Sequence, residues 1–135
     1  MQNFTEEERI ELTKMVLAVL NDWGTSEAIQ IQLLDLSGDI KPRHMKRYYY
    51  DDVPLPDEQQ VYQRIEHIMG IAEALRTSYP LNEAAGVVWL NRRNRRFGDR
   101  KPIDVMLEDG INGVLAIRTH LDCAYDWHMD DQKNS

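Results

Sequence analysis

WLNRRNRRFGDRKPIDVMLEDGINGVLAIRTHL, residues 89–121, indicates the fold more clearly than any other stretch of the chain. The apolar end of one helix leads into an arginine-rich loop. Pro102 then suits the first turn of a second helix, because proline lacks only an amide hydrogen that would be unpaired there. Gly110 breaks this helix before a final, largely apolar one. The stretch therefore predicts three helices joined by a basic loop and a tight turn.

Helical patterns continue toward the N-terminus, and no convincing strand is found. Thr5 and Glu8 form a capping-box pattern in front of the first helix. An apolar stripe with helical spacing follows it: Leu12, Met15, Val16, Val19 and Leu20. Thr25 is expected to cap a second helix that ends by Leu36. Pro42 suits the first turn of a third helix, which two later prolines bring to an end.

A longer helix is predicted to begin at its cap, Asp57, and to end at Tyr79. Apolar residues recur along it at alternating spacings of four and three: Val61, Ile65, Ile68, Ala72, Leu75 and Tyr79. This repeat predicts a continuous packing seam. Short helices over residues 82–90 and 102–108 and a last helix over residues 111–127 complete an all-α fold.

Charge is distributed unevenly along the chain. The net charge is −7, from 16 Lys and Arg against 23 Asp and Glu, which alone argues against binding to nucleic acid. Residues 41–47, however, hold four cations and no anion, and residues 91–101 hold six cations and one anion. Because phosphate binding depends on local cation density, the sequence predicts two basic contact surfaces on an acidic body.

The first basic cluster lies on the predicted third helix, which follows a helix and a tight turn. In a helix-turn-helix the second helix enters the major groove, with one stripe packed inward and hydrogen-bond donors outward. Met45 and Tyr49 are four residues apart and are expected to form the inward stripe, with Tyr50 outside. The side chains predicted to contact DNA are Lys41, Arg43, His44, Lys46 and Arg47. The alternative is a surface helix that is basic by chance.

The second basic cluster, residues 91–101, contains an aromatic residue and a glycine. An aromatic ring is costly to leave exposed, and glycine allows a tight backbone turn. We therefore expect Phe97 to turn back onto Trp89 or Leu90, and the arginines to reach a partner. A second nucleic-acid surface, a dimer contact and a solvated connector remain alternatives.

No catalytic or metal centre is predicted. The one spacing typical of metal ligands joins His120, Cys123 and His128, which lack a fourth ligand and supporting residues. Cys123 is expected to be a small buried hydrophobe, because a nucleophilic cysteine needs a base and an orienting group nearby. The sequence thus favours a protein that is not an enzyme and has no cofactor.

The first twelve residues lack a basic n-region and a long apolar run, and no window of the chain approaches the roughly 18 apolar residues of a membrane span. A single cysteine fits a reducing compartment. We expect a cytoplasmic protein without membrane contact.

Residues 89–121 resemble the toxin-binding domain of the Xre/MbcA/ParS antitoxin family. The resemblance rests on Trp89, Leu90, Asn94, Phe97, Gly98, Pro102, Asp104, Met106, Leu107, Gly110, Val114 and Leu121. Arg93 departs from the pattern, which often has proline at this place. Upstream, Trp23-Gly24-Thr25, Leu33-Leu34 and Arg64-Ile65 look like the Xre-type helical region that precedes this domain in the family.

This resemblance implies an antitoxin that binds and inhibits a RES-domain toxin, an enzyme that depletes NAD in the family. It also implies repression of its own promoter, and hence contact with operator DNA, by a homodimer, because dimeric helix-turn-helix proteins match two-fold operators. The alternative is a stand-alone helix-turn-helix transcriptional regulator without a toxin. A remote third possibility is a small enzyme that uses Cys123 and histidines.

The predicted organisation is a helix-turn-helix region with its long connecting helix over residues 1–79, a helical toxin-binding domain over residues 80–128 and a flexible tail over residues 129–135. The residues predicted to contact the toxin are Arg92, Arg93, Asn94, Arg96, Asp122, Asp126 and Trp127. A toxin that consumes NAD must present cationic or amide donors to the two phosphates. Carboxylates and an indole ring could block such a site. The alternative is that Trp127 only caps the core and that the aspartates face solvent.

Overall fold

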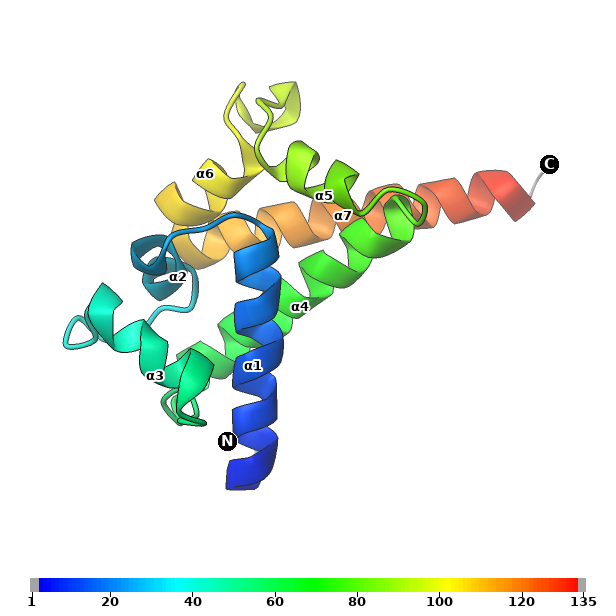
Figure 1. Ribbon diagram of the computed structural model, residues 1–135. Coiled ribbons are helices and arrows are strands. Elements are labelled where there is room, and N and C mark those ends of the chain that lie inside the picture. The colour runs from blue at the N-terminus through cyan, green and yellow to red at the C-terminus, as the bar shows by residue number, and fades with distance from the viewer. Residues whose placement is uncertain (1–2, 134–135) are drawn as a thin grey trace. The chain divides into compact units, whose positions relative to one another are not determined.

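The computed structural model describes the backbone of residues 3–133 and the side chains of residues 3–82 and 84–123. This part of the chain forms seven α-helices and two short 3-10 helices, shown in chain order in Figure 1, and contains no strand. An isolated antiparallel bridge joins Asn94 to Arg100. The predicted all-α fold is therefore confirmed. The chain divides into two compact units, Met1–Met69 and Gly70–Ser135, which are described separately.

The first unit opens with helix α1, Glu6–Asp22. The predicted capping box is present, because Thr5 Oγ1 accepts from the Glu8 amide at 3.1 Å and Glu8 Oε1 accepts from the Thr5 amide at 3.0 Å. The predicted apolar stripe was wrong in part, since Met15 is 47% exposed. The buried residues of α1 are Thr13, Val16, Leu17 and Leu20.

Thr13 shifts the buried face of α1 because it fastens another segment to the helix. Its hydroxyl accepts from the Leu55 amide at 2.9 Å and donates to the Arg9 carbonyl at 2.8 Å. The Arg9 guanidinium donates to the Leu55 carbonyl at 2.9 Å. The proline-flanked Leu55, which itself is buried, is thus held to α1 through both of its backbone polar groups.

Three short helices complete the part of the unit that precedes the long helix: α2, Glu27–Leu33; the 3-10 helix η1, Pro42–His44; and α3, Met45–Tyr50. Ser26, and not the predicted Thr25, caps α2, because Ser26 Oγ accepts from the Ile29 amide at 3.3 Å. Thr25 instead donates its hydroxyl to the Leu20 carbonyl at 2.7 Å. The buried Arg64 donates to the Leu33 carbonyl at 3.1 Å and so satisfies the C-terminal end of α2.

Helix α4, Gln59–Ser78, spans the boundary between the two units. Of the predicted seam, the residues that are buried are Val61, Ile65, Ile68 and Leu75. Tyr79 follows the helix and is partly exposed. No helix in the described part of the chain has the length and apolar character needed to cross a membrane.

The second unit continues with α5, Glu83–Leu90; η2, Arg95–Phe97; α6, Pro102–Glu108; and α7, Gly110–Lys133. Helix α6 packs against α7 (Figure 1). Gly113 permits this contact, because a Cβ atom built on it would lie 2.1 Å from the Val105 carbonyl oxygen. The turn between α6 and α7 uses Gly110 in the left-handed region, with φ of 61°.

Candidate nucleic-acid and toxin interfaces

The first candidate surface is the outer face of η1 and α3. Arg43, Lys46 and Arg47 are exposed, and their spacing, extended to Tyr50, places them on one side of the helix. Met45 is fully buried on the other side, as predicted, whereas the second inward residue is Tyr48, 6% exposed, and not Tyr49. Tyr49 is half-buried, and its hydroxyl bonds to Asn21 and Gln30.

Lys41 and His44, two of the predicted DNA contacts, are the N-cap and the last residue of η1. His44 Nδ1 accepts from the Lys41 amide at 2.9 Å, so this imidazole completes the start of the helix while the Lys41 side chain remains exposed. Desolvation lowers the pKa of His44, and the neighbouring charges of Arg47, Arg43 and Lys41 lower it further. A lowered pKa keeps the ring neutral and Nδ1 able to accept this bond.

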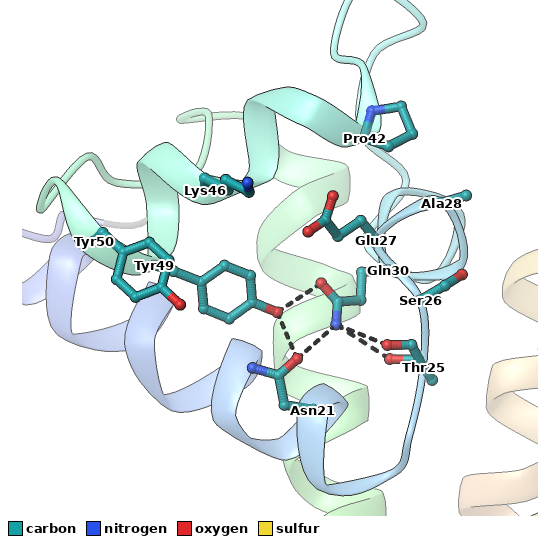
Figure 2. A pocket seen from close by; sticks show the side chains of 10 residues that line it. All are labelled: Asn21, Thr25, Ser26, Glu27, Ala28, Gln30, Pro42, Lys46, Tyr49 and Tyr50. Atoms are coloured by element: carbon teal, nitrogen blue, oxygen red, sulfur yellow. Dashed lines mark hydrogen bonds between the residues drawn. The ribbon is translucent and has the colours of Figure 1, made fainter.

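An open groove of about 640 Å³ lies beside α3. Figure 2 shows its floor, where Tyr49 from α3 reaches Asn21 at the end of α1 and Gln30 in α2. Lys46 and Tyr50 line the groove from α3, and the first residues of α2 line it opposite. These residues bring the ends of three helices of the first unit together.

The second candidate surface is the arginine-rich loop, residues 91–101. Asn94 closes it: its amide donates to the Arg100 carbonyl at 3.1 Å, its carbonyl accepts from the Asp99 amide at 3.0 Å, and its side chain accepts from the Arg96 amide at 3.0 Å. Gly98 and Asp99 reverse the backbone in the left-handed region, with φ of 68° and 62°. The loop is therefore an ordered turn.

Arg100 fastens this loop to the end of α6. Its guanidinium donates to both carboxylate oxygens of Asp109, at 3.1 and 3.0 Å, and to Glu108 at 3.2 Å. The hydrogen bonds to Asp109, followed by those to Glu108, raise the pKa of Arg100. Hydrogen bonding to Arg100 lowers the pKa of Asp109. A bidentate arginine pair fixes geometry better than a single contact does.

Phe97 packs beneath the loop, which confirms that it turns back onto Trp89. The two rings meet edge to face, with centroids 6.4 Å apart. Phe97 also meets His120 of α7 edge to face at 5.3 Å, and His120 is stacked on Trp89 at 5.8 Å. Burial, and then the charge of Arg96, lowers the pKa of His120. Three aromatic rings from α5, η2 and α7 thus support the loop.

The side chains that this scaffold presents to solvent are Arg92, Arg93, Arg95 and Arg96, all exposed. Arg93 Nη1 lies 3.8 Å from Asp99 Oδ2. Asn94, a predicted toxin contact, is half-buried and closes the loop. The ordered turn therefore holds its cations outward on a fixed backbone.

The predicted C-terminal contacts lie on α7. Asp122 is exposed, and its Oδ2 atom lies 3.8 Å from Arg118 Nε. The side chains of Asp126 and Trp127 lie outside the described residues. Cys123 is exposed, so the expectation of a buried cysteine was wrong; it lies on the outer side of α7, two positions after the buried Leu121.

Metal ligands do not gather within residues 3–82 and 84–123: no three His, Cys, Asp or Glu side chains there are placed to hold an ion. His128, the third member of the spacing noted in the sequence, lies outside the described side chains.

Two structural roles were not recognised in the sequence. No sequence pattern around Gln30 predicts that its side-chain amide is buried. Its position on the inner side of α2 is the only feature of the sequence that indicates burial. Arg100 could be recognised as part of a basic run, but its partners follow eight and nine residues later, across a helix.

One comparison with known proteins covers the part of the chain that contains the arginine-rich loop. No curated protein matches the chain. Residues 74–123, however, match the family described as Antitoxin Xre/MbcA/ParS C-terminal toxin-binding domain. The matched residues lie inside the second compact unit and include the aromatic support, the arginine-rich loop and α6. This part of the chain is therefore similar to the toxin-binding domain of antitoxins, and the similarity supports an antitoxin role.

Proposed function

We propose that the chain is the antitoxin of a type II toxin–antitoxin system and that it binds and inhibits a RES-domain toxin that depletes NAD. The observation that carries this proposal is the match of residues 74–123 to an antitoxin toxin-binding domain. Inhibition by binding requires no chemistry from the chain, so the proposed role is not enzymatic.

The arginine-rich loop supplies one part of the proposed contact. Arg92, Arg93 and Arg96 would meet acidic groups on the toxin, with Asn94 holding the backbone that presents them. An ordered loop loses little conformational entropy on binding, which favours affinity. Arginine is also among the residues enriched at interface positions that carry most of the binding energy.

The end of α7 supplies the other part. Asp122, Asp126 and Trp127 would occupy the NAD site, where donors that bind the two phosphates would meet carboxylates and an indole ring instead. A chain that ends at His120 tests this role. It should remain helical by circular dichroism but lose protection of growth against the co-expressed toxin; full protection would assign inhibition to the loop and α6.

The first unit supplies the proposed promoter contact. Helices α2 and α3, with the turn between them, would act as a helix-turn-helix in which Lys41, Arg43, Lys46 and Arg47 face DNA. His44 would orient the start of η1. A cytoplasmic homodimer would place two such units on a two-fold operator and repress the antitoxin's own promoter.

The cationic face of α3 also favours a second candidate, a transcriptional regulator that has no toxin. The reading frame next to this gene discriminates between the two, because an antitoxin requires a toxin gene beside it.

Affinity purification after co-expression with that toxin tests the first proposal directly. The wild-type chain should retain the toxin, and Arg92→Ala/Arg93→Ala/Arg96→Ala should retain much less, since interface anchors each contribute on the order of 2 kcal/mol. Lys41→Ala/Lys46→Ala/Arg47→Ala, which removes three exposed cations from the first unit, serves as the control for lost surface charge. Absence of a complex with the wild-type chain would exclude the antitoxin function.

A further inference from the structure

Tyr49, near the end of α3, takes part in a cluster of polar side chains that is separate from the exposed cations of that helix. Its hydroxyl lies 2.7 Å from Gln30 Oε1 and 2.8 Å from Asn21 Oδ1. Gln30 is 1% exposed, and its Nε2 donates to Asn21 Oδ1 at 3.0 Å. The same nitrogen lies 3.3 Å from the carbonyl and from the hydroxyl of Thr25. Figure 2 shows these side chains converging on the floor of the groove.

In this cluster the Tyr49 hydroxyl of α3 is a hydrogen-bond donor, and its two partners are acceptors. Both partners of the hydroxyl are amide oxygens, so the single phenolic proton is given to one of them at a time. Burial raises the pKa of Tyr49 above that of a free phenol, which is itself protonated at neutral pH, so the hydroxyl is a donor. The contact is therefore a directional hydrogen bond from α3 that has one acceptor in α1 and one in α2.

Within the described part of the chain, Tyr49 is the one side chain of α3 that makes a hydrogen bond to another helix. The helix has six residues, and its buried side chains, Met45 and Tyr48, pack through apolar and aromatic surface. Hydrophobic burial is non-directional. It therefore keeps a short helix packed against its neighbours, but it constrains the rotation of that helix about its own axis less strongly. The hydroxyl of Tyr49, one position after Tyr48, can fix that rotation.

We propose that Tyr49 is a positioning residue for DNA recognition: its bonds to Gln30 and Asn21 orient α3 so that its outer face discriminates operator from other DNA. This inference rests on the proposed promoter binding. Phosphate contacts by the cations supply affinity for any duplex, whereas discrimination requires side chains aligned with base edges. Loss of the Tyr49 hydroxyl should therefore reduce discrimination more than affinity.

The test compares Tyr49→Phe with the wild-type chain on two labelled duplexes, the region upstream of its own reading frame and a scrambled duplex of the same composition. The variant should lose roughly tenfold or more of its preference for the upstream duplex, the scale of a lost base contact. Its affinity for the scrambled duplex, and the salt dependence of that affinity, should not change. Tyr62→Phe, a hydroxyl deletion elsewhere in the same unit, should preserve the preference.

A variant destabilised elsewhere in the same unit separates positioning from simple stabilisation. Tyr49→Phe leaves the buried Gln30 oxygen without this donor, which should lower the melting temperature. Thr13→Val also lowers the melting temperature, because it removes the buried acceptor of the Leu55 amide, but this bond does not involve α3. At a temperature where both variants are folded, Thr13→Val should keep the preference for the upstream duplex and Tyr49→Phe should lose it. An equal loss of preference in the two variants would reduce Tyr49 to a structural role.

Two failures can be told apart. A wild-type chain that binds both duplexes equally would overturn promoter recognition and this inference with it. A wild-type chain that prefers the upstream duplex, together with a Tyr49→Phe variant of unchanged preference, would overturn only the positioning role.

Discussion

Single residues decide where backbones in this protein approach most closely. Thr13 is a polar residue on a buried helix face, and its hydroxyl both donates to α1 and accepts from Leu55. Gly113 has no side chain at a place where α7 meets the Val105 carbonyl. Neither role could be predicted from helical periodicity, because each depends on a segment that is distant in sequence or on the packing of a neighbouring helix.

Gly113→Ala should destabilise the protein although alanine is the better helix former by about 1 kcal/mol. The added methyl would overlap the Val105 carbonyl oxygen, so α6 and α7 must separate, at a cost of about 1–3 kcal/mol. Urea denaturation measures the free energy of unfolding. Gly38→Ala is the matched control, since a Cβ atom there meets open space; equal stability of the two variants would show that α6 and α7 are not in close contact.

Thr13→Val should cost about 1–3 kcal/mol of unfolding free energy, because the nearly isosteric side chain leaves the Leu55 amide without its acceptor. Thr13→Ser keeps the hydroxyl and should lose much less. Thermal unfolding followed by circular dichroism measures both. A valine variant as stable as the serine variant would show that this bond contributes nothing.

Among the elements, helices with strong end signals could be predicted well and inward faces less well. Pro102 placed the start of α6, and the Thr5 capping box placed the start of α1. The inward face of α3 was predicted as Met45 and Tyr49 but contains Tyr48, which follows Met45 by three residues, whereas Tyr49 is half-buried and bonds to Gln30 through its hydroxyl. Side-chain bonds between helices leave no period in the sequence.

Helix α3 should carry the affinity for DNA. Lys46→Ala/Arg47→Ala should abolish the shift of promoter DNA at moderate salt, and the slope of log affinity against log salt should fall by roughly one unit for each lost phosphate contact. Retention of toxin in the affinity purification should be unchanged. The control Lys14→Ala/Arg76→Ala removes the same charge elsewhere; an equal loss of DNA binding in the control would point to net charge and not to α3.

Arg100 should order the arginine-rich loop. Arg100→Met keeps the length of the side chain but removes the pairs with Asp109 and Glu108. Hydrogen exchange at the Asp99 amide, which bonds to the Asn94 carbonyl, should accelerate while the amides of α7 stay protected. Toxin affinity should fall as the loop loses its fixed geometry. Unchanged exchange at Asp99 would show that Asn94 and Phe97 suffice to hold the loop.

On the scale of the whole molecule, an acidic chain with a net charge of −7 concentrates its cations on two surfaces that belong to different compact units. This division could be anticipated from the sequence as charge patterning. The scaffold that supports the second surface, the Trp89, Phe97 and His120 rings, joins residues that lie as many as 31 positions apart. Because the two surfaces lie on different units, we expect variants to separate DNA binding from toxin inhibition.

If the proposed RES-domain toxin is encoded beside this chain, the concentration of cellular NAD after induction of that toxin tests the proposed antitoxin function most directly. Co-expression of the wild-type chain should hold NAD at its uninduced level, and Lys46→Ala/Arg47→Ala should protect equally well. Arg92→Ala/Arg93→Ala/Arg96→Ala should allow NAD to fall. A fall in NAD in the presence of abundant wild-type chain, as steep as with the toxin alone, would contradict the account.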